Sequence, residues 1–118
     1  MGALVRLKKR REFVKIAEQG QKYVTSGLIL QALFRSEDTR FQDAIRVGFT
    51  TSRKVGNAVK RNRVRRRLRE VARFVLPQMG QPGTDYVIIG RTKTADRPFA
   101  CLIEDLKDAL KNTKGTDS

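Results

Sequence analysis

The sequence contains no histidine, no tryptophan and a single cysteine, Cys101. The lack of histidine removes the usual general base near neutral pH and the commonest protein metal ligand. One cysteine cannot form an internal disulfide or the usual structural zinc site, and it suits a reducing compartment. Because Cys101 lies in the apolar run 99–103, we interpret it as a packed thiol. The composition therefore gives little support to an active site carried by the protein itself.

Long hydrophobic runs are absent as well, since no segment approaches the roughly 20 apolar residues of a membrane span. The N-terminal segment turns basic at Arg6, which does not fit a signal peptide. We therefore expect a cytoplasmic protein with no membrane partner. A chain of 118 residues has the length of one domain. We expect a single domain over 1–118, with an ordered core at about 4–111 and a flexible C-terminal tail from Asn112.

Acidic residues are few: 12 Asp and Glu stand against 26 Lys and Arg, which gives a net charge of +14. Such a charge attracts polyanions. It is also unevenly spread, because every charged residue from Arg53 to Arg69 is basic. A basic block of this kind indicates a nucleic-acid partner better than an evenly solvated surface does.

The acids that are present form no convincing active site. Glu37, Asp38 and Asp43 fall in an expected surface loop, where acids are common. Glu104 and Asp105, with Asp108, fall on or near the exposed side of the expected last helix. We therefore predict no catalytic residue and no metal-ligand set in this chain.

Hydrophobic periodicity predicts the elements of the fold. Helices are expected at 8–19, from about 57 to 76 with Pro77 ending the helix, and from Pro98 onward; strands are expected at 27–35, 46–51 and 86–90. This order predicts an α+β domain whose helices pack on a sheet. The helical stripes expected to face the core are Val64, Leu68, Val71, Ala72 and Val75, and Phe99, Ile103, Leu106 and Leu110.

The strand at 46–51 has two different faces. Val47 and Phe49 share one face and are expected to pack under the long helix. The opposite face carries Arg46, Gly48 and Thr50. It reads as too polar for a second core, and Gly48 leaves room there for the close approach of a ligand or for helix packing.

Residues 50–63 join this strand to the start of the long helix. Backbone N–H groups at a helix N-terminus favour anions, and Lys54, Lys60, Arg61 and Arg63 surround this one. Asn57 is a natural N-cap, a structural role that does not conflict with anion binding. The segment therefore predicts a phosphate-binding site.

Several runs follow one another in a recognisable order: RVGF at 46–49, SRKVGNAVKRNR at 52–63, then Arg65-Arg66 and Leu68-Arg69-Glu70. Together with LKKR at 7–10, Phe13 and DYVII at 85–89, they closely resemble the bacterial ribonuclease P protein family. Arg61-Asn62-Arg63 is similar to the hallmark Arg-Asn-Arg motif of that family. The resemblance covers roughly 4–110, nearly the whole chain.

The resemblance implies an αβββαβα sandwich with a small mixed sheet and a left-handed βαβ crossover, and a further strand near 23–26 or within 27–51. It implies a protein subunit that helps a catalytic RNA remove the 5′ leader of precursor tRNA, with cleavage by Mg²⁺ bound mainly to the RNA. No protein partner is required. The residues implied to contact the catalytic RNA are Lys54, Asn57, Lys60, Arg61, Asn62, Arg63, Arg65, Arg66 and Arg69.

A separate cleft for the single-stranded leader is implied between the first helix and the sheet. Its expected residues are Phe13, Gln31, Arg46, Gly48 and Thr50, although Phe13 could equally be core. Ala17 and Gln31 stand where the family often has aromatic residues. Because stacking on an aromatic residue contributes about 1–3 kcal/mol per base, leader contacts here are expected to rely less on stacking.

Two other classes of protein are compatible with this basic composition and fold class. One is a ribosomal protein, and the other is a DNA-binding module that places the arginine-rich helix in a major groove. Only the ordered motifs exclude the ribosomal protein. Against the DNA-binding module, the dense arginines on several sides of 60–69 suit close packing on phosphates better than the reading of a few base edges.

Overall fold

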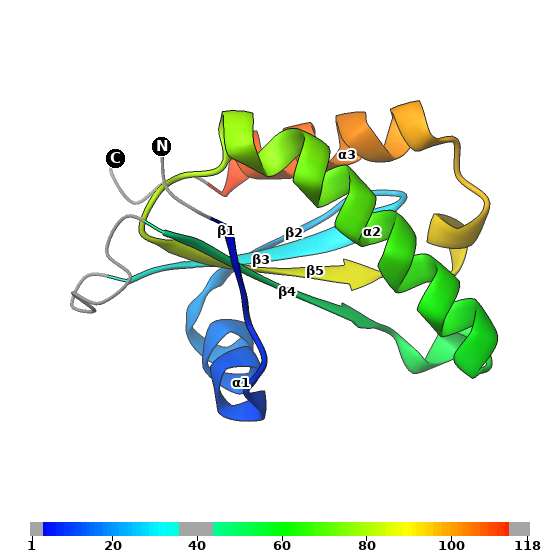
Figure 1. Cartoon of the computed structure of the whole chain (residues 1–118), viewed down its shortest axis with the longest axis horizontal. Coiled ribbons are helices and arrows are strands. Elements are labelled where there is room, and N and C mark those ends of the chain that lie inside the picture. The colour runs from blue at the N-terminus through cyan, green and yellow to red at the C-terminus, as the bar shows by residue number, and fades with distance from the viewer. Residues whose placement is uncertain (1–3, 36–43, 114–118) are drawn as a thin grey trace.

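The computed structural model describes residues 4–35 and 44–113 (Figure 1). The expected loop with Glu37, Asp38 and Asp43, and the end of the tail, lie outside the described residues. The predicted α+β class is confirmed, with one short strand, β1, before the expected αβββαβα order. The elements are β1 (Leu4–Arg6), α1 (Arg10–Gln19), β2 (Gln21–Val24), β3 (Leu28–Phe34), β4 (Ile45–Thr51), the 3₁₀ turn η1 (Arg53–Val55), α2 (Ala58–Met79), β5 (Thr84–Gly90), the 3₁₀ turn η2 (Thr92–Ala95) and α3 (Phe99–Asn112).

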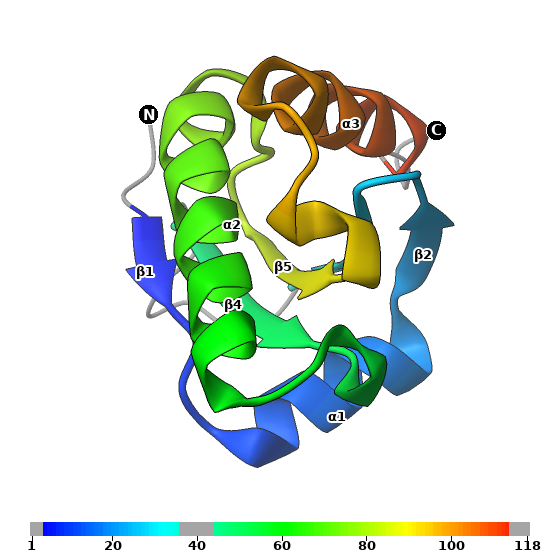
Figure 2. The same ribbon diagram turned by 90° about the vertical axis from the view of Figure 1, so that its right-hand side faces the viewer.

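The five strands form one mixed sheet in the order β1-β4-β5-β3-β2. β4 pairs in parallel with β1 and β5, while β3 pairs antiparallel with β5 and β2. In Figure 2, β4 and β5 run toward the viewer, α2 lies above the sheet and β5 lies to the right of β4. The β4–α2–β5 crossover is therefore left-handed, against the strong preference for right-handed units.

The main core lies between the sheet and the two helices α2 and α3 (Figure 1). The predicted stripe of α2 is confirmed, since each of its residues is at most 2% exposed. It belongs to one core cluster with Leu28 and Leu30 of β3 and with Tyr86 and Ile88 of β5. Burial raises the pKa of Tyr86 above its ordinary value, and its hydroxyl accepts a hydrogen bond of 2.9 Å from the Gln81 N–H.

The face of the sheet toward α1 holds a second, smaller core, so the prediction that this face is too polar for one was wrong. Leu7, Ile16 and Val87 are buried there, and Phe13 packs against them. The polar residues of β4 suggested an open surface, but Leu7 and Ile16 reach this face from outside the sheet. These residues pack α1 against the sheet.

The ends of two helices differ from the sequence-based expectation. α2 continues through Pro77 to Met79 and is capped by Gly80, whose N–H donates to the Leu76 carbonyl at 2.8 Å. A proline in the last turn removes one hydrogen bond, and its φ fits a helix, so it did not end the helix. Asn112, expected to begin the tail, belongs to α3, and Thr113 is buried beside it.

The buried stripe of α3 is also shifted from the predicted one. Leu106 and Leu110 are buried as expected, but Phe99 is 37% exposed and Leu102 is fully buried instead. Asp105, predicted on or near the exposed side, is 9% exposed and pairs with Arg97, its Oδ2 lying 2.6 Å from Nε. Because its charge is neutralised by Arg97, Asp105 can lie on the buried face of α3, and a pattern of apolar residues alone could not predict this.

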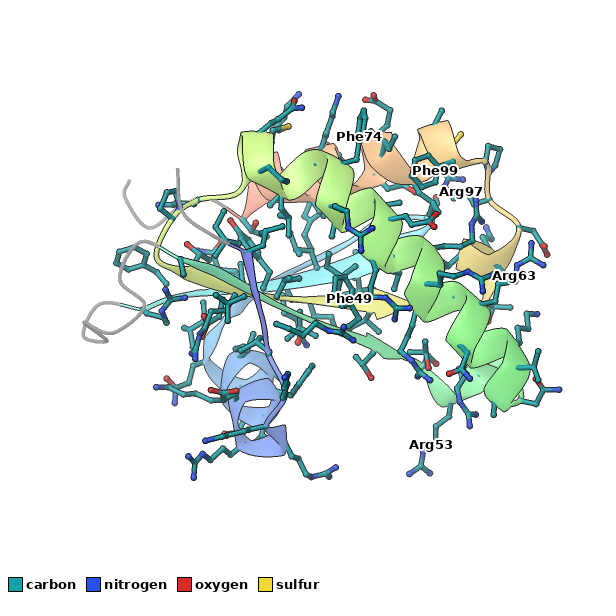
Figure 3. All side chains as sticks on the ribbon, viewed as in Figure 1. Phe49, Arg53, Arg63, Phe74, Arg97 and Phe99 are labelled. Atoms are coloured by element: carbon teal, nitrogen blue, oxygen red, sulfur yellow. The ribbon has the colours of Figure 1, made fainter. Side chains whose placement is uncertain are left out.

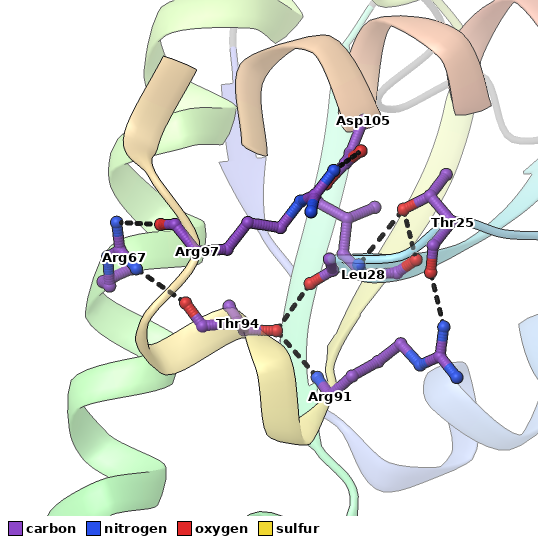
Figure 4. A network of polar contacts seen from close by, with 8 residues as sticks. Thr25, Leu28, Arg67, Arg91, Thr94, Arg97 and Asp105 are labelled. Carbon is purple, nitrogen blue, oxygen red and sulfur yellow. Dashed lines mark hydrogen bonds and ion pairs between the residues drawn. The ribbon is translucent and has the colours of Figure 1, made fainter. Parts of the chain in front are cut away.

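Arg67 ties α2 to the segment that follows β5 (Figure 4). Its guanidinium donates to the carbonyl oxygens of Thr94 at 2.6 Å, Ala95 at 2.9 Å and Arg97 at 2.7 Å. The Thr94 hydroxyl, fully buried, donates in turn to the Gly27 carbonyl. One arginine of the basic block is therefore part of the fold and is not available to a ligand.

Replacement of Arg67 by alanine should destabilise the domain by about 1–3 kcal/mol, because partly buried carbonyls lose a charged donor. Arg66→Ala is the matched control: Arg66 is exposed and should change stability by no more than about 0.5 kcal/mol. Urea denaturation followed by circular dichroism measures both. Equal effects of the two substitutions would contradict the structural role of Arg67.

Candidate nucleic-acid interface

The connection from β4 to α2 is built by local hydrogen bonds. Ser52 Oγ accepts from the Lys54 N–H at 3.1 Å, and Asn57 Oδ1 accepts from the Lys60 N–H at 3.0 Å. Gly56 lies between them with a φ of 135°, a backbone angle that residues with a side chain rarely adopt. Arg61 Nη1 donates to the Gly56 carbonyl at 2.6 Å. The expected cap at Asn57 is confirmed, and the turn holds the basic residues of both segments around one helix end.

The nine residues predicted to bind the catalytic RNA lie together on η1, its flank and the first three turns of α2. Lys54, Asn57, Asn62, Arg63 and Arg66 are exposed, and Lys60, Arg61, Arg65 and Arg69 are half-buried. None of their cations forms an ion pair with an acid within the described residues. The result is one uncompensated cationic surface, which we call the α2 basic face.

The contacts that these residues do make are local. Arg65 donates to Asn62 Oδ1, and Arg63 reaches the Ala95 carbonyl at 3.4 Å, a long hydrogen bond. Figure 3 shows Arg53 extending away from the body of the domain and Arg63 beside η2. The charges of the face are therefore positioned by neutral partners and stay available to an anion.

A groove of about 480 Å³ runs along α1 on the opposite side of the sheet from α2. It brings together three residues predicted for the leader cleft, Phe13, Gln31 and Thr50. Sequence reasoning missed its other walls, although the basic residues before α1 were a visible signal. These walls are Lys8, Arg10, Val14, Phe49, Val87 and Ile89; Ala17, which the sequence already placed at an aromatic position of the family's cleft, lines the groove as well. We call this surface, with its aromatic floor and basic rim, the α1 groove.

Gly48 was expected to leave an open floor in this groove, but it does not. It is buried, and a Cβ at this position would lie 2.5 Å from Cζ of the Phe13 ring. The alternative of helix packing is therefore supported, with α1 as the helix. β5 separates the strands of Gln31 and Gly48, and its Val87 pairs with both residues.

Arg46 lies outside the α1 groove, on the far flank of α1. Its guanidinium binds Asp85 through two hydrogen bonds of 2.8 and 2.7 Å and reaches Glu12 at 3.1 Å. Asp85 also accepts from Arg35 and is 4% exposed. The charge of Arg46 is thus engaged inside the protein, which contradicts its expected role as a cation for the leader.

The described residues do not fit a metal centre of the protein's own. No group of three or more acids, cysteines or histidines gathers within 4–35 and 44–113. A pocket on the flank of α1 that faces Arg46 contains two acids, Glu12 and Asp85, and both pair with Arg46. Within the described part of the chain, no helix is long and apolar enough to cross a membrane.

Comparison with known proteins shows which proteins this chain is similar to. The sequence is 51% identical over 108 residues to the ribonuclease P protein component of Paramagnetospirillum magneticum, covering 92% of this chain and 81% of that protein. It is 53% identical over 106 residues to the component of Ruegeria pomeroyi, covering 89% and 82%.

Solved structures show the same fold. The ribonuclease P protein of Thermotoga maritima matches with a TM-score of 0.76 and 28% identity, over 93% of this chain and 98% of that one. The protein of Staphylococcus aureus matches with a TM-score of 0.74 and 27% identity, over 92% and 94%. Residues 1–114 match the family described as Ribonuclease P. The chain therefore belongs to the ribonuclease P protein family.

Proposed function

We propose that this chain is the RNA-binding protein subunit of ribonuclease P, and that it assists the catalytic RNA in the endonucleolytic removal of the 5′ leader from precursor tRNA. Family membership gives it a role in ribonuclease P and a partnership with the ribonuclease P RNA in tRNA processing. It also disfavours the ribosomal and DNA-binding alternatives. We further propose a cytoplasmic location and no requirement for a second protein.

The observation that carries the proposal is the presence of two different RNA-compatible surfaces on one domain. The α2 basic face offers dense, uncompensated charge, which suits the close-packed phosphates of a folded RNA. The α1 groove offers an aromatic ring, apolar walls and a basic rim, which suit unpaired bases. We assign the catalytic RNA to the first surface and the leader to the second.

The chemistry of cleavage belongs, in this proposal, to the RNA partner. We propose that Mg²⁺ is held mainly by the RNA, since no group of three or more acids, cysteines or histidines gathers within 4–35 and 44–113. The protein's own contribution is to bind both RNAs and to lower the repulsion between their phosphates by placing cations beside them.

The protein mixed with the catalytic RNA at low Mg²⁺ should raise the rate of leader removal, and the protein alone should cleave nothing. The reason is that the basic surfaces supply binding but no group positioned to activate water. Gel analysis of precursor tRNA with each component separately and together measures this. Specific leader removal by RNA-free protein, after nuclease controls, would refute the proposal.

The double substitution Arg63→Ala/Arg66→Ala should weaken binding to the catalytic RNA and flatten its salt dependence. Each lost phosphate contact reduces the slope of log K against log salt by about 0.7–0.9, so a reduction of up to about 1.8 is expected. Filter binding over a salt series measures the slope.

The matched control for charge is Lys107→Ala/Lys111→Ala on α3, which removes the same number of cations far from the α2 basic face. This variant should leave the slope nearly unchanged. Equal slopes for both double variants would show that net charge alone, and not the α2 basic face, drives binding.

Phe13→Leu should reduce the affinity advantage of precursor over mature tRNA by about 5–100-fold, because leucine keeps the apolar packing but offers no ring for stacking. Phe74→Leu is the control, since Phe74 is 56% exposed on α2, away from the α1 groove. Binding of both tRNAs to the assembled ribonucleoprotein, together with Tm, is measured. Loss of affinity for mature tRNA by the same factor would argue against a leader contact.

A further inference from the structure

A second, smaller groove lies between β1 and α2, on the other side of the sheet edge from the α1 groove. It has a volume of about 150 Å³. This is below the roughly 300 Å³ at which small-molecule sites begin, so it suits one flat group of a larger ligand. Its lining is Leu4, Val5, Arg6, Val47, Phe49, Arg69, Ala72 and Arg73. We call it the edge groove.

The groove exists because β1 is short. β1 pairs with β4 only as far as Arg6 opposite Val47, so the rest of β4 forms an open edge of the sheet. Phe49 lies two residues beyond Val47, and its side chain is only half-buried at this edge. The residue lines both the edge groove and the α1 groove, which makes it the point where the two surfaces meet.

The chemistry of the edge groove is that of a stacking site with surrounding charge. The guanidinium carbon of Arg6 lies 5.4 Å from the centroid of the Phe49 ring, within the range of a cation–π contact. Arg69 and Arg73 come from the facing side of α2. None of these three arginines pairs with an acid within the described residues. An aromatic ring, a planar cation and two further cations are the elements that bind an unpaired nucleotide.

We propose that the edge groove binds a leader nucleotide adjoining those held in the α1 groove, with its base against Phe49 and Arg6 and its phosphate beside Arg73. This inference rests on the proposed function, since it needs a leader in the α1 groove. The shared Phe49 gives the leader a continuous path around the edge of β4. The leader is favoured over the folded catalytic RNA because the edge groove is narrow and continues a groove suited to single strands.

The test uses the protein assembled with the catalytic RNA and precursor tRNAs whose leaders lengthen one nucleotide at a time. Arg6→Gln/Arg73→Gln should leave the affinity for short leaders unchanged. It should remove a gain of about 5–100-fold that appears once the leader is long enough to enter the edge groove. Both arginines are exposed, so Tm should not change. Lys22→Gln on β2, at the opposite edge of the sheet, should alter neither affinity.

The possible outcomes separate this inference from the proposed function. An equal loss at every leader length, mature tRNA included, would assign the edge groove to the catalytic RNA and overturn the inference. No loss at any length would overturn it as well. If Phe13→Leu still lowers affinity for short leaders in the same assay, the proposed function survives either result. If neither Phe13→Leu nor Arg6→Gln/Arg73→Gln changes the affinity for any leader, both the leader contact in the α1 groove and the edge-groove inference are refuted.

Discussion

The ion pairs of the buried Asp85 carboxylate connect the strands of the sheet to one another and, through Arg46, to α1. It accepts hydrogen bonds from Arg35 at the end of β3 and from Arg46 on β4, and Arg46 extends to Glu12 on α1. A domain with an excess of cations cannot bury an arginine without a partner, because an unpaired buried charge is strongly destabilising. By pairing with both, Asp85 allows two arginines to be buried where they connect different elements of the fold. Asp105 does the same for Arg97 beside α3.

This use of acids and carbonyls divides the arginines into two groups. Those that hold the fold are neutralised by carboxylates or, like Arg67, donate to several backbone carbonyls, whereas Arg61 and Arg63 of the α2 basic face each donate to one. Those on the α2 basic face have no acid to neutralise them within the described residues. Their mutual repulsion weakens the free domain, and the phosphates of an RNA would relieve it. The binding surface is thus the set of cations that the folded chain leaves uncompensated.

The sequence predicted what local pattern determines and missed what distant partners determine. The buried stripe of α2 and the cap at Asn57 follow from spacing and residue type within a few positions, and both were predicted correctly. Arg46 was expected to face RNA because its partner Asp85 lies 39 residues away in sequence. Gly48 was expected to be open because nothing in its own strand indicates the ring of Phe13 above it. Single-sequence patterns could not reveal either contact.

The position of both RNA-compatible surfaces follows from one strand. The seven residues of β4 direct Thr50 into the α1 groove and Phe49 to the open edge, and the chain then continues through Ser52 into η1 and the N-terminus of α2. Because β4 is hydrogen-bonded along its length to β5, these groups keep fixed distances from one another. A ligand held on the α2 basic face and a strand held along α1 are therefore aligned by the sheet itself. The two ligands can therefore be held in a fixed relative position without any movement between domains.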